Sequence, residues 1–411
     1  MKTRRDLIAA LDVGTTKVCC FAARTQPELS VIGIGHHASS GLRSGTIVDM
    51  DAARDSIVRA VHAAEQMAEE TVRNVIVNVS SGGLSSQTLG VELSIAGHEV
   101  GDGDLRRILN QGRHHFERED REIIHSIPVG FSIDGSRGIR DPRGMYGERL
   151  GVNVHLVTAA SGPVRNLANC VGRCHLDIES FIVSPYASGL ACLVEDEIDL
   201  GVTCVDMGGG TTTIAIFFDG NVVCTDSVPL GGGHVTSDIA RGLSCSLTHA
   251  ERMKTLYGSA VSSPLDDQES IDVPLIGDNA HAQANHVPKS LLNGIIQPRV
   301  EETFELVRDR LEASGLNKIA GRRVVLTGGA SQLQGIRDLA AQILDKQVRR
   351  GRPIGIRGLA EATGGPAFST CAGMLAHAVK TLSDSHMAAR GLLEEPSGLV
   401  GRLGHWIREN L

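Results

Sequence analysis

A chain of 411 residues is long enough to build two or more globular domains, each with its own hydrophobic core. Its 48 glycines and its aromatic content of only 3% predict a turn-rich α/β protein whose core uses small aliphatic side chains. The net charge of −8, with no long basic run, is not that of a typical nucleic-acid-binding protein, so we expect no nucleic acid partner.

The cysteines and the apolar runs indicate the cellular compartment in which we expect the protein to work. The nine cysteines are scattered, and several lie inside apolar runs, as is typical of reduced cysteines in a cytosolic protein. Cys170 and Cys174 share a predicted helix face, but no second pair at metal-ligand spacing completes a site. The basic residues at 1–5 precede an apolar segment that Asp12 interrupts, which argues against a signal peptide. No apolar run approaches the length of a bilayer, so we expect no transmembrane segment.

Apolar runs in the N-terminal region predict three strands, a helix and a fourth strand, in the order 7–12, 17–23, 30–37, 51–70 and 74–79. The first turn combines an acid, a glycine, two hydroxyls and a lysine, namely Asp12, Gly14, Thr15, Thr16 and Lys17. A glycine without a Cβ atom lets backbone N–H groups approach a phosphate closely. One such turn alone would favour an ordinary hairpin.

The next segment, 81–160, interrupts this order and predicts a small α+β insert. We expect three strands, over 89–95, 123–133 and 152–159, and a helix from a cap at Asp102 to Phe116. The last two strands are joined by a polar loop over 134–149.

A helix over 163–174 and a strand over 178–183 follow the insert, and a further helix begins at Ser184. The start of that helix, Ser184-Pro185-Tyr186, holds neither a carboxylate nor an amide. The resemblance described below implies that a Gln or Glu at this helix start would orient an attacking water. Because a hydroxyl is a poor general base at neutral pH, it also implies that nucleotide hydrolysis is slower than the ~1–10³ s⁻¹ of committed enzymes.

The strand that starts at Val202 ends in a second acidic glycine turn, which consists of Asp206, Gly208, Gly209, Gly210, Thr211 and Thr212. Apolar runs at 214–218 and 221–228 predict a hairpin after it. Asp206, at the strand end, is placed to hold a metal ion through water. Two such turns in two similar halves predict two jaws that close on one nucleotide triphosphate. The chain lacks Gly-x-x-x-x-Gly-Lys-[Ser/Thr], so it is not a P-loop protein.

Three further features lie in the second half. Gly232 and Gly233 precede a helix whose N-terminus can face a ligand. Glu251 and Lys254 stand three residues apart on the next helix, where a solvated ion pair is the plain interpretation. A strand over 323–327 ends in the turn Gly328, Gly329 and Ala330.

The remaining elements of the second half are less regular. Segment 259–290 predicts a loop with one short strand at 271–276, and a long helix kinked at Pro298 follows it. Two more helices are expected over 332–344 and 368–381. In the second of them, Ala372-Gly373 permits close packing on a counterpart near Gly189.

The C-terminal region separates into a linker, 383–397, and an amphipathic helix, 398–411. On a helical wheel its apolar residues fall within roughly 140° of arc: Leu399, Val400, Leu403, Trp406, Ile407 and Leu411. The polar residues Arg402, His405 and Arg408 lie opposite. An apolar face with flanking arginines and a tryptophan is typical of an interfacial membrane helix, and a helix docked on its own domain is the alternative.

These motifs, in this order, resemble those of the actin-like ATPase superfamily. The early insert and the amphipathic tail are similar to those of the FtsA family of bacterial cell-division proteins. The turn Asp141-Pro142-Arg143-Gly144-Met145-Tyr146-Gly147, followed by Leu150, matches that family closely, although its turn residues also predict a surface loop without any resemblance. The resemblance extends from Leu7 to Leu411.

The resemblance implies an α/β, actin-like (ribonuclease H-like) fold: a duplicated core of two domains with an inserted small α+β subdomain and a C-terminal amphipathic helix. The implied boundaries are a first core (7–80, 161–199 and 366–382), the insert (81–160), a second core (200–235 and 295–365) and a flanking lobe (236–294).

The resemblance also implies the role of each motif. ATP would be the nucleotide, with Asp12 and Asp206 holding Mg²⁺ through water. Asp12 to Lys17 would form the first phosphate loop and Asp206 to Thr212 the second. Gly232 and Gly233 would lie against the ribose and phosphates, Glu251 would reach the ribose, Lys254 would pack beside adenine, and the turn from Gly328 to Ala330 would lie against the base.

For partners, the resemblance implies self-assembly into filaments and binding of the FtsZ C-terminal tail by the flanking lobe. It further implies peripheral attachment to the cytoplasmic face of the inner membrane at the division site, and recruitment of later divisome membrane proteins. Two alternatives stay open at this point. One is another actin-like assembly protein of the pilus-assembly or cell-shape type, and the other is a sugar-kinase-type phosphotransferase.

Overall fold

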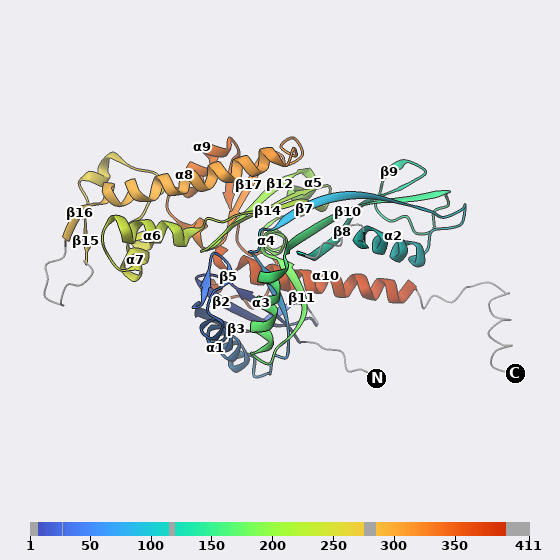
Figure 1. Ribbon diagram of the computed structural model, residues 1–411, viewed down its shortest axis with the longest axis horizontal. Helices are drawn as coiled ribbons and strands as arrows, with labels where there is room; N and C mark the ends of the chain where they lie inside the picture. Colours follow the sequence, from blue (N-terminus) through green and yellow to red (C-terminus); the bar gives the residue numbers. More distant parts are fainter. Residues whose placement is uncertain (1–6, 27, 115–119, 275–284, 392–411) are drawn as a thin grey trace.

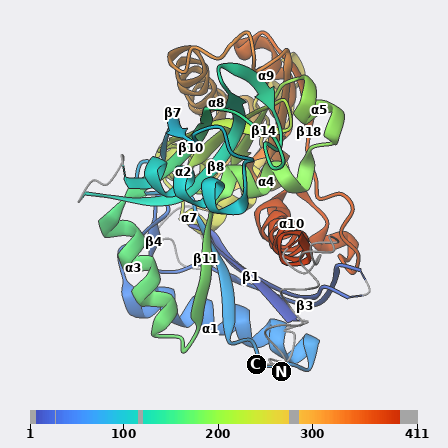
Figure 2. The same ribbon diagram turned by 90° about the vertical axis from the view of Figure 1, so that its right-hand side faces the viewer.

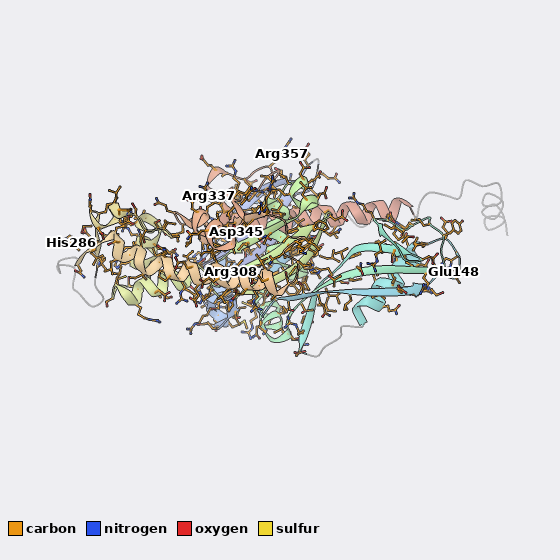
Figure 3. The ribbon with its side chains drawn as sticks, turned by 90° about the horizontal axis from the view of Figure 1, so that it is seen from above. Glu148, His286, Arg308, Arg337, Asp345 and Arg357 are labelled. Atoms are coloured by element: carbon orange, nitrogen blue, oxygen red, sulfur yellow. The ribbon has the colours of Figure 1, made fainter. Side chains whose placement is uncertain are left out.

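The computed structural model describes four stretches of the chain, 7–26, 28–114, 120–274 and 285–391. Their strands form two five-stranded sheets, a four-stranded sheet and two small hairpins. The molecule is elongated, with the four-stranded sheet at one end of its long axis (Figure 1). In the view from above, Glu148 lies at that end and His286 lies at the other (Figure 3).

The first five-stranded sheet contains the predicted N-terminal strands. Its spatial order is β11 (Asp177–Val183), β6 (Asn74–Val79), β1 (Leu7–Val13), β2 (Lys17–Arg24) and β3 (Ser30–Ala38). β1, β2 and β3 are antiparallel neighbours, whereas β6 and β11 pair in parallel. Because both faces of β1 and β2 are covered, these strands are apolar at nearly every position. One face packs on α1 (Met50–Ala68) and α3 (Ser161–Gly172), and the other on α4 (Ser184–Cys192) and α10 (Ser369–Gly391).

The second five-stranded sheet repeats this arrangement. Its order is β14 (Asn221–Val228), β13 (Thr212–Phe218), β12 (Val202–Met207), β17 (Arg323–Thr327) and β18 (Gln347–Arg350). Its outer face packs on α6 (Gly232–Gly242), α8 (Lys289–Ala313) and α9 (Ile336–Leu344). Its inner face shares one hydrophobic core with α4, α10 and the first sheet. The two helices therefore lie between the sheets (Figure 2).

The insert is a four-stranded antiparallel sheet with one helix, α2 (Asp102–His114). Its order is β7 (Ser85–Ser94), β10 (Arg149–Ala160), β8 (Arg121–Ile133) and β9 (Ser136–Ile139). β9 corrects the expectation of a strandless loop over 134–149. Asp134 and Gly135 both adopt positive φ, which makes the tight turn that folds the chain back onto β8. Asp102 is the first residue of the helix rather than a residue before it.

The lobe that contains His286 combines α7 (Leu247–Tyr257) with a small hairpin. The single strand expected at 271–276 is instead a pair, β15 (Ser270–Val273) and β16 (Asn285–Pro288), in antiparallel register. A further short hairpin, β4 (Leu42–Arg43) and β5 (Thr46–Ile47), follows β3. A six-residue helix, α5 (Glu195–Leu200), leads from α4 into β12.

Two helix boundaries differ from the sequence predictions by more than two residues. α9 begins at Ile336 and not at Gln332, because Gly335 has a φ of 74° that right-handed helix does not allow. α10 continues through residues 383–391, which we expected to belong to the linker. That stretch contains Ala388, Ala389 and Arg390, which favour a helix, and the helix-breaking Pro396 comes only later. The predicted membrane helix, 398–411, and the rest of the predicted linker lie outside the described residues.

None of the helices in the described stretches combines the length and the apolar composition that crossing a bilayer requires.

Candidate functional site

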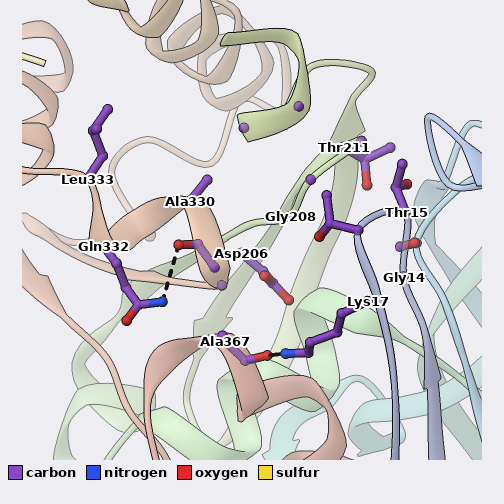
Figure 4. Close-up of a pocket in the computed structure, with 18 of the residues that line it drawn as sticks. Gly14, Thr15, Lys17, Asp206, Gly208, Thr211, Ala330, Gln332, Leu333 and Ala367 are labelled. Atoms are coloured by element: carbon purple, nitrogen blue, oxygen red, sulfur yellow. Dashed lines mark hydrogen bonds between the residues drawn. The ribbon is translucent and has the colours of Figure 1, made fainter. Parts of the chain in front are cut away.

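A cavity of about 440 Å³ lies where the two five-stranded sheets meet, and both acidic glycine turns line it (Figure 4). Every residue that we predicted to bind nucleotide contributes to its wall, with the exception of Thr212. Further wall residues come from β6, α4 and α10, namely Asn78, Ser184 and Thr370. Residues far apart in sequence therefore converge on one polar cavity.

The first turn connects β1 to β2. The Gly14 N–H donates to the Lys17 carbonyl oxygen at 3.0 Å, which closes a tight hairpin. The Thr15 hydroxyl accepts a hydrogen bond from the Gly45 N–H at 2.8 Å, so the β4–β5 turn is held against the loop. The Lys17 ammonium donates to the Ala367 carbonyl and stands 3.9 Å above the ring centre of Phe368. The lysine thus connects the first turn to the start of α10.

Asp12 ends β1 and faces the cavity as a buried carboxylate. Burial raises its pKa to about 6, the nearby Lys17 ammonium lowers it, and the Asp206 carboxylate raises it. Two neighbouring buried carboxylates repel each other when both are ionised, and a cation bound between them relieves this repulsion. Carboxylate oxygens are the ligands that Mg²⁺ prefers in proteins.

The second turn stacks its backbone on the first turn of α6, which begins at Gly232 and therefore includes the two glycines that we expected to precede it. Gly208 donates to the Thr211 carbonyl at 2.9 Å, while Gly232 donates to Gly208 at 2.9 Å and Gly233 to Gly209 at 2.8 Å. A Cβ atom on Gly209 would lie 2.3 Å from the Thr16 methyl group of the first turn. The two jaws therefore touch through a position that only glycine can occupy.

Asp206 ends β12 and is also buried against the cavity. Its Oδ2 accepts hydrogen bonds from the hydroxyls of Ser188 and Thr370. Burial raises the pKa of Asp206, and the two hydroxyls and the Lys17 ammonium oppose that rise. Asp12 and Asp206 fit the predicted Mg²⁺ role as a pair. Within the described stretches, no cluster of three or more His, Cys, Asp or Glu residues could bind a metal directly.

The far end of the cavity is lined by α7 and by the turn after β17. Lys254 donates to the Gly232 carbonyl at 3.1 Å, to the Thr236 hydroxyl at 2.8 Å and to Glu251 Oε2 at 2.6 Å. Those three acceptors use all three N–H donors of the ammonium. The predicted ion pair between Glu251 and Lys254 is therefore present. Lys254 also binds the Gly232 carbonyl at the start of α6 and occupies one carboxylate oxygen of Glu251.

The turn after β17 brings bare backbone to the cavity. Gly328 has a φ of 83°, and a Cβ atom there would lie 2.3 Å from Asp206 Oδ1. Its N–H donates to the Pro366 carbonyl at 3.1 Å. Gly329 and Ala330 complete the wall together with Gln332, whose amide donates to the Gly329 carbonyl at 3.3 Å (Figure 4).

Thr212 is the one predicted residue that does not line the cavity, and the structure brings to the cavity residues that we did not predict. Thr211 and Thr213 line the cavity, whereas the Thr212 hydroxyl points away and donates to the Leu230 carbonyl at 2.8 Å. Successive side chains of a strand point to opposite faces, so this alternation was available in the sequence. Asn78 accepts from the Val13 N–H at 2.7 Å and donates to the Ser184 hydroxyl at 3.1 Å. In the sequence, Asn78 was recognisable as a single amide side chain within the apolar strand 74–79.

The predicted membrane-contacting residues cannot be placed in the same way. Leu399, Val400, Arg402, Leu403, Trp406, Ile407 and Arg408 all lie outside the described residues.

Two family models match the chain. The model described as Cell division protein FtsA matches residues 203–373, and the model of the SHS2 domain inserted in FtsA matches residues 81–158. The second match coincides with the four-stranded insert.

Solved structures with a similar fold include actin-like proteins. The PilM–PilN type IV pilus biogenesis complex has a TM-score of 0.64 at 16% identity and covers 90% of this chain and 98% of that chain. MreB5 of Spiroplasma citri bound to ADP has a TM-score of 0.55 at 15% identity, with coverage of 93% and 99%. At such identities the likeness shows the actin-like fold alone.

Curated relatives align along the whole chain. Cell division protein FtsA of Rhizobium meliloti (strain 1021) is 45% identical over 421 residues, which cover 99% of this chain and 95% of the relative. The protein of the same name from Escherichia coli (strain K12) is 31% identical over 415 residues, with coverage of 99% and 97%. The chain therefore belongs to the FtsA family of cell division proteins and has an actin-like fold with an inserted SHS2 domain.

Proposed function

We propose that the chain binds ATP with Mg²⁺ in the cavity between its two five-stranded sheets. The observation that carries this proposal is the convergence of both acidic glycine turns on one cavity of about 440 Å³. Backbone N–H groups of the two turns would cradle the phosphates, since their glycines let the backbone come close. Asp12 and Asp206 would hold Mg²⁺ through its water molecules, and the ion would offset the negative charge of the phosphates.

The other end of the cavity supports a ribose and base site. Glu251 uses one carboxylate oxygen to bind Lys254 and Thr236, and its second oxygen would accept from a ribose hydroxyl. The bare turn from Gly328 to Ala330 would lie against the base. Turnover should be slow, because Ser184 occupies the cavity wall where a carboxylate or amide would orient water.

We further propose that the chain assembles with copies of itself and tethers FtsZ at the cytoplasmic face of the inner membrane. Membership of a cell-division family supports this role, and so does the amphipathic pattern at 398–411. The lobe from 236 to 294 would receive the FtsZ C-terminal tail, and later divisome membrane proteins would join at the division site. Attachment would be peripheral, through the apolar face that includes Trp406.

The nucleotide site is tested by Asp206→Ala. Removal of this carboxylate should abolish the rise in thermal midpoint that Mg·ATP gives the parent protein, because the charge that holds the ion is lost. Asp309→Ala is the control, since Asp309 is exposed on α8 and does not line the cavity. Differential scanning fluorimetry with and without Mg·ATP compares the three proteins. Equal stabilisation of Asp206→Ala and parent would refute the two-jaw site.

A further inference from the structure

Two hydroxyls from two different helices bind the same oxygen of Asp206. Ser188 Oγ of α4 lies 2.6 Å from Asp206 Oδ2, and Thr370 Oγ1 of α10 lies 3.0 Å from it. The two hydroxyl oxygens are themselves 3.0 Å apart. All three side chains are buried, and Ser188 is completely inaccessible to solvent. We call Ser188 and Thr370 the hydroxyl clamp.

The protons of the clamp are fully used when Asp206 is ionised. Each hydroxyl carries one proton, and a carboxylate only accepts. In the arrangement in which both hydroxyls donate to Oδ2, neither proton is left to donate to a ligand or to water. Within the described stretches, no hydrogen bond reaches Asp206 Oδ1. The clamp fixes the carboxylate through one oxygen and leaves the other for a partner in the cavity.

The packing of α4 on α10 sets the position of both hydroxyls. Gly373, one helical turn after Thr370, packs so closely on α4 that a Cβ atom would lie 1.7 Å from the Ala187 carbonyl oxygen. Ser188 is the next residue along α4. Asp206, by contrast, comes from β12 of the second sheet, so the clamp joins the helices between the sheets to the sheet that carries the acid.

We propose that Ser188 and Thr370 are positioning residues that hold Asp206 so that its free oxygen accepts from a water molecule of the nucleotide-bound Mg²⁺. This inference rests on the proposed ATP and Mg²⁺ site, and it assigns to two residues outside the predicted set a specific effect on the metal. Hydrogen-bond partners of a metal-binding group orient it, and their removal typically weakens metal affinity by about 10–100-fold.

The test removes the hydroxyls without emptying the site. Thr370→Val keeps the shape of the side chain and removes the hydroxyl, whereas Thr370→Ser keeps the hydroxyl and removes a methyl group. Ser188→Ala removes the other half of the clamp. Ser369→Ala is the matched control, because Ser369 is equally buried on α10 but contacts Thr327 and Cys192 instead of Asp206. The dissociation constant of ATP is measured by calorimetry for each full-length protein, in Mg²⁺ and again in EDTA.

We expect parent, Thr370→Ser and Ser369→Ala to bind ATP more tightly in Mg²⁺ than in EDTA. Ser188→Ala and Thr370→Val should lose about tenfold in affinity with Mg²⁺ and keep the parent affinity in EDTA. Equal losses in both buffers would indicate a merely structural role and overturn the inference, as would variants that keep the full Mg²⁺ effect. A parent that binds no ATP in either buffer would instead refute the proposed function. If Ser188→Ala does not fold, the comparison of Thr370→Val with Thr370→Ser still tests the positioning role.

Discussion

At the scale of single residues, His125 shows how burial and one hydrogen bond fix a protonation state. The ring is buried on β8 of the insert and meets Tyr186 of α4 edge-on, with ring centres 5.4 Å apart. Its Nε2 accepts from the Val183 N–H at 3.0 Å, which only the unprotonated nitrogen can do. Burial, together with the nearby His377 and His155, lowers the pKa of His125 from 6.5 to about 3.

This lowered pKa makes stability depend on pH in a definite direction. Between pH 6.5 and 3 the unfolded chain binds a proton at His125 that the folded chain does not, so the free energy of unfolding falls with falling pH. From pH 7 to pH 5 the loss from this one group is about 2 kcal/mol. We predict that His125→Gln, measured by urea unfolding at both pH values, shows a loss smaller by about that amount.

His62→Gln serves as the control for that comparison, because His62 is exposed on α1. It should retain the pH dependence of the parent. If His125→Gln also retains it, the ring is protonated in the folded protein and the account of its burial is wrong.

Residue-level prediction succeeded where a residue type leaves few alternatives. Glycines beside acids at strand ends indicated the two turns that line the cavity, because glycine allows the closest backbone approach. Ser188 and Thr370 left no such signal. A hydroxyl in a helix is most often explained by a local backbone hydrogen bond, and only the crossing of α4 and α10 brings these two to Asp206.

At the scale of elements, the packing of α4 on α10 positions Ser188 and Thr370 beside Asp206. Gly373 of α10 lies against the backbone of Ala187, as the predicted close approach near Gly189 required. Phe217 of β13 packs on Gly189 from the other side, where a Cβ atom would lie 2.3 Å from its ring. α4 is therefore closely packed both on α10, at Ala187, and on β13, at Gly189.

We predict that Gly373→Ala destabilises the protein, because the added methyl group must push α10 away from α4. Overpacked cores typically lose about 1–3 kcal/mol. Gly294→Ala is the matched control: Gly294 lies inside α8 with no atom within 4 Å of a new Cβ. That change should stabilise by about 0.5–1 kcal/mol, since alanine favours a helix over glycine. The thermal midpoints of Gly373→Ala and Gly294→Ala are measured and compared. Equal midpoints for the two variants would show that the α4–α10 crossing tolerates a side chain.

Elements with strong patterns could be predicted from the sequence, and elements defined by pairing could not. The strands 74–79, 221–228 and 323–327 agree with β6, β14 and β17 to the residue. The short strands β9, β16 and β18 have only four residues each, and their pairing partners decide that they are strands. Tertiary pairing of this kind outweighs local preference in short segments.

At the scale of the whole molecule, α10 runs from the cavity towards one end of the long axis. Thr370 lies in its first turn and lines the cavity, and Gly391 is its last residue (Figure 1). The helix extends on the side of the insert.

One short amphipathic helix binds a membrane weakly and reversibly, as a single lipid chain does. Many such helices on one polymer act together, because each bound neighbour holds the next near the surface. Trp406 should contribute most to the contact, since its ring suits the boundary between headgroups and acyl chains. The proposed tether thus combines assembly, membrane contact and FtsZ binding in one chain.

Co-sedimentation of FtsZ with anionic liposomes tests that claim most directly. FtsZ is mixed with liposomes and ATP in the presence of the parent, of Trp406→Glu, or of His405→Glu, which adds a carboxylate on the polar face instead. We predict that FtsZ pellets with the parent and with His405→Glu, and that it stays in the supernatant with Trp406→Glu. Pelleting of FtsZ with all three proteins, or with none, would contradict the proposed membrane tether.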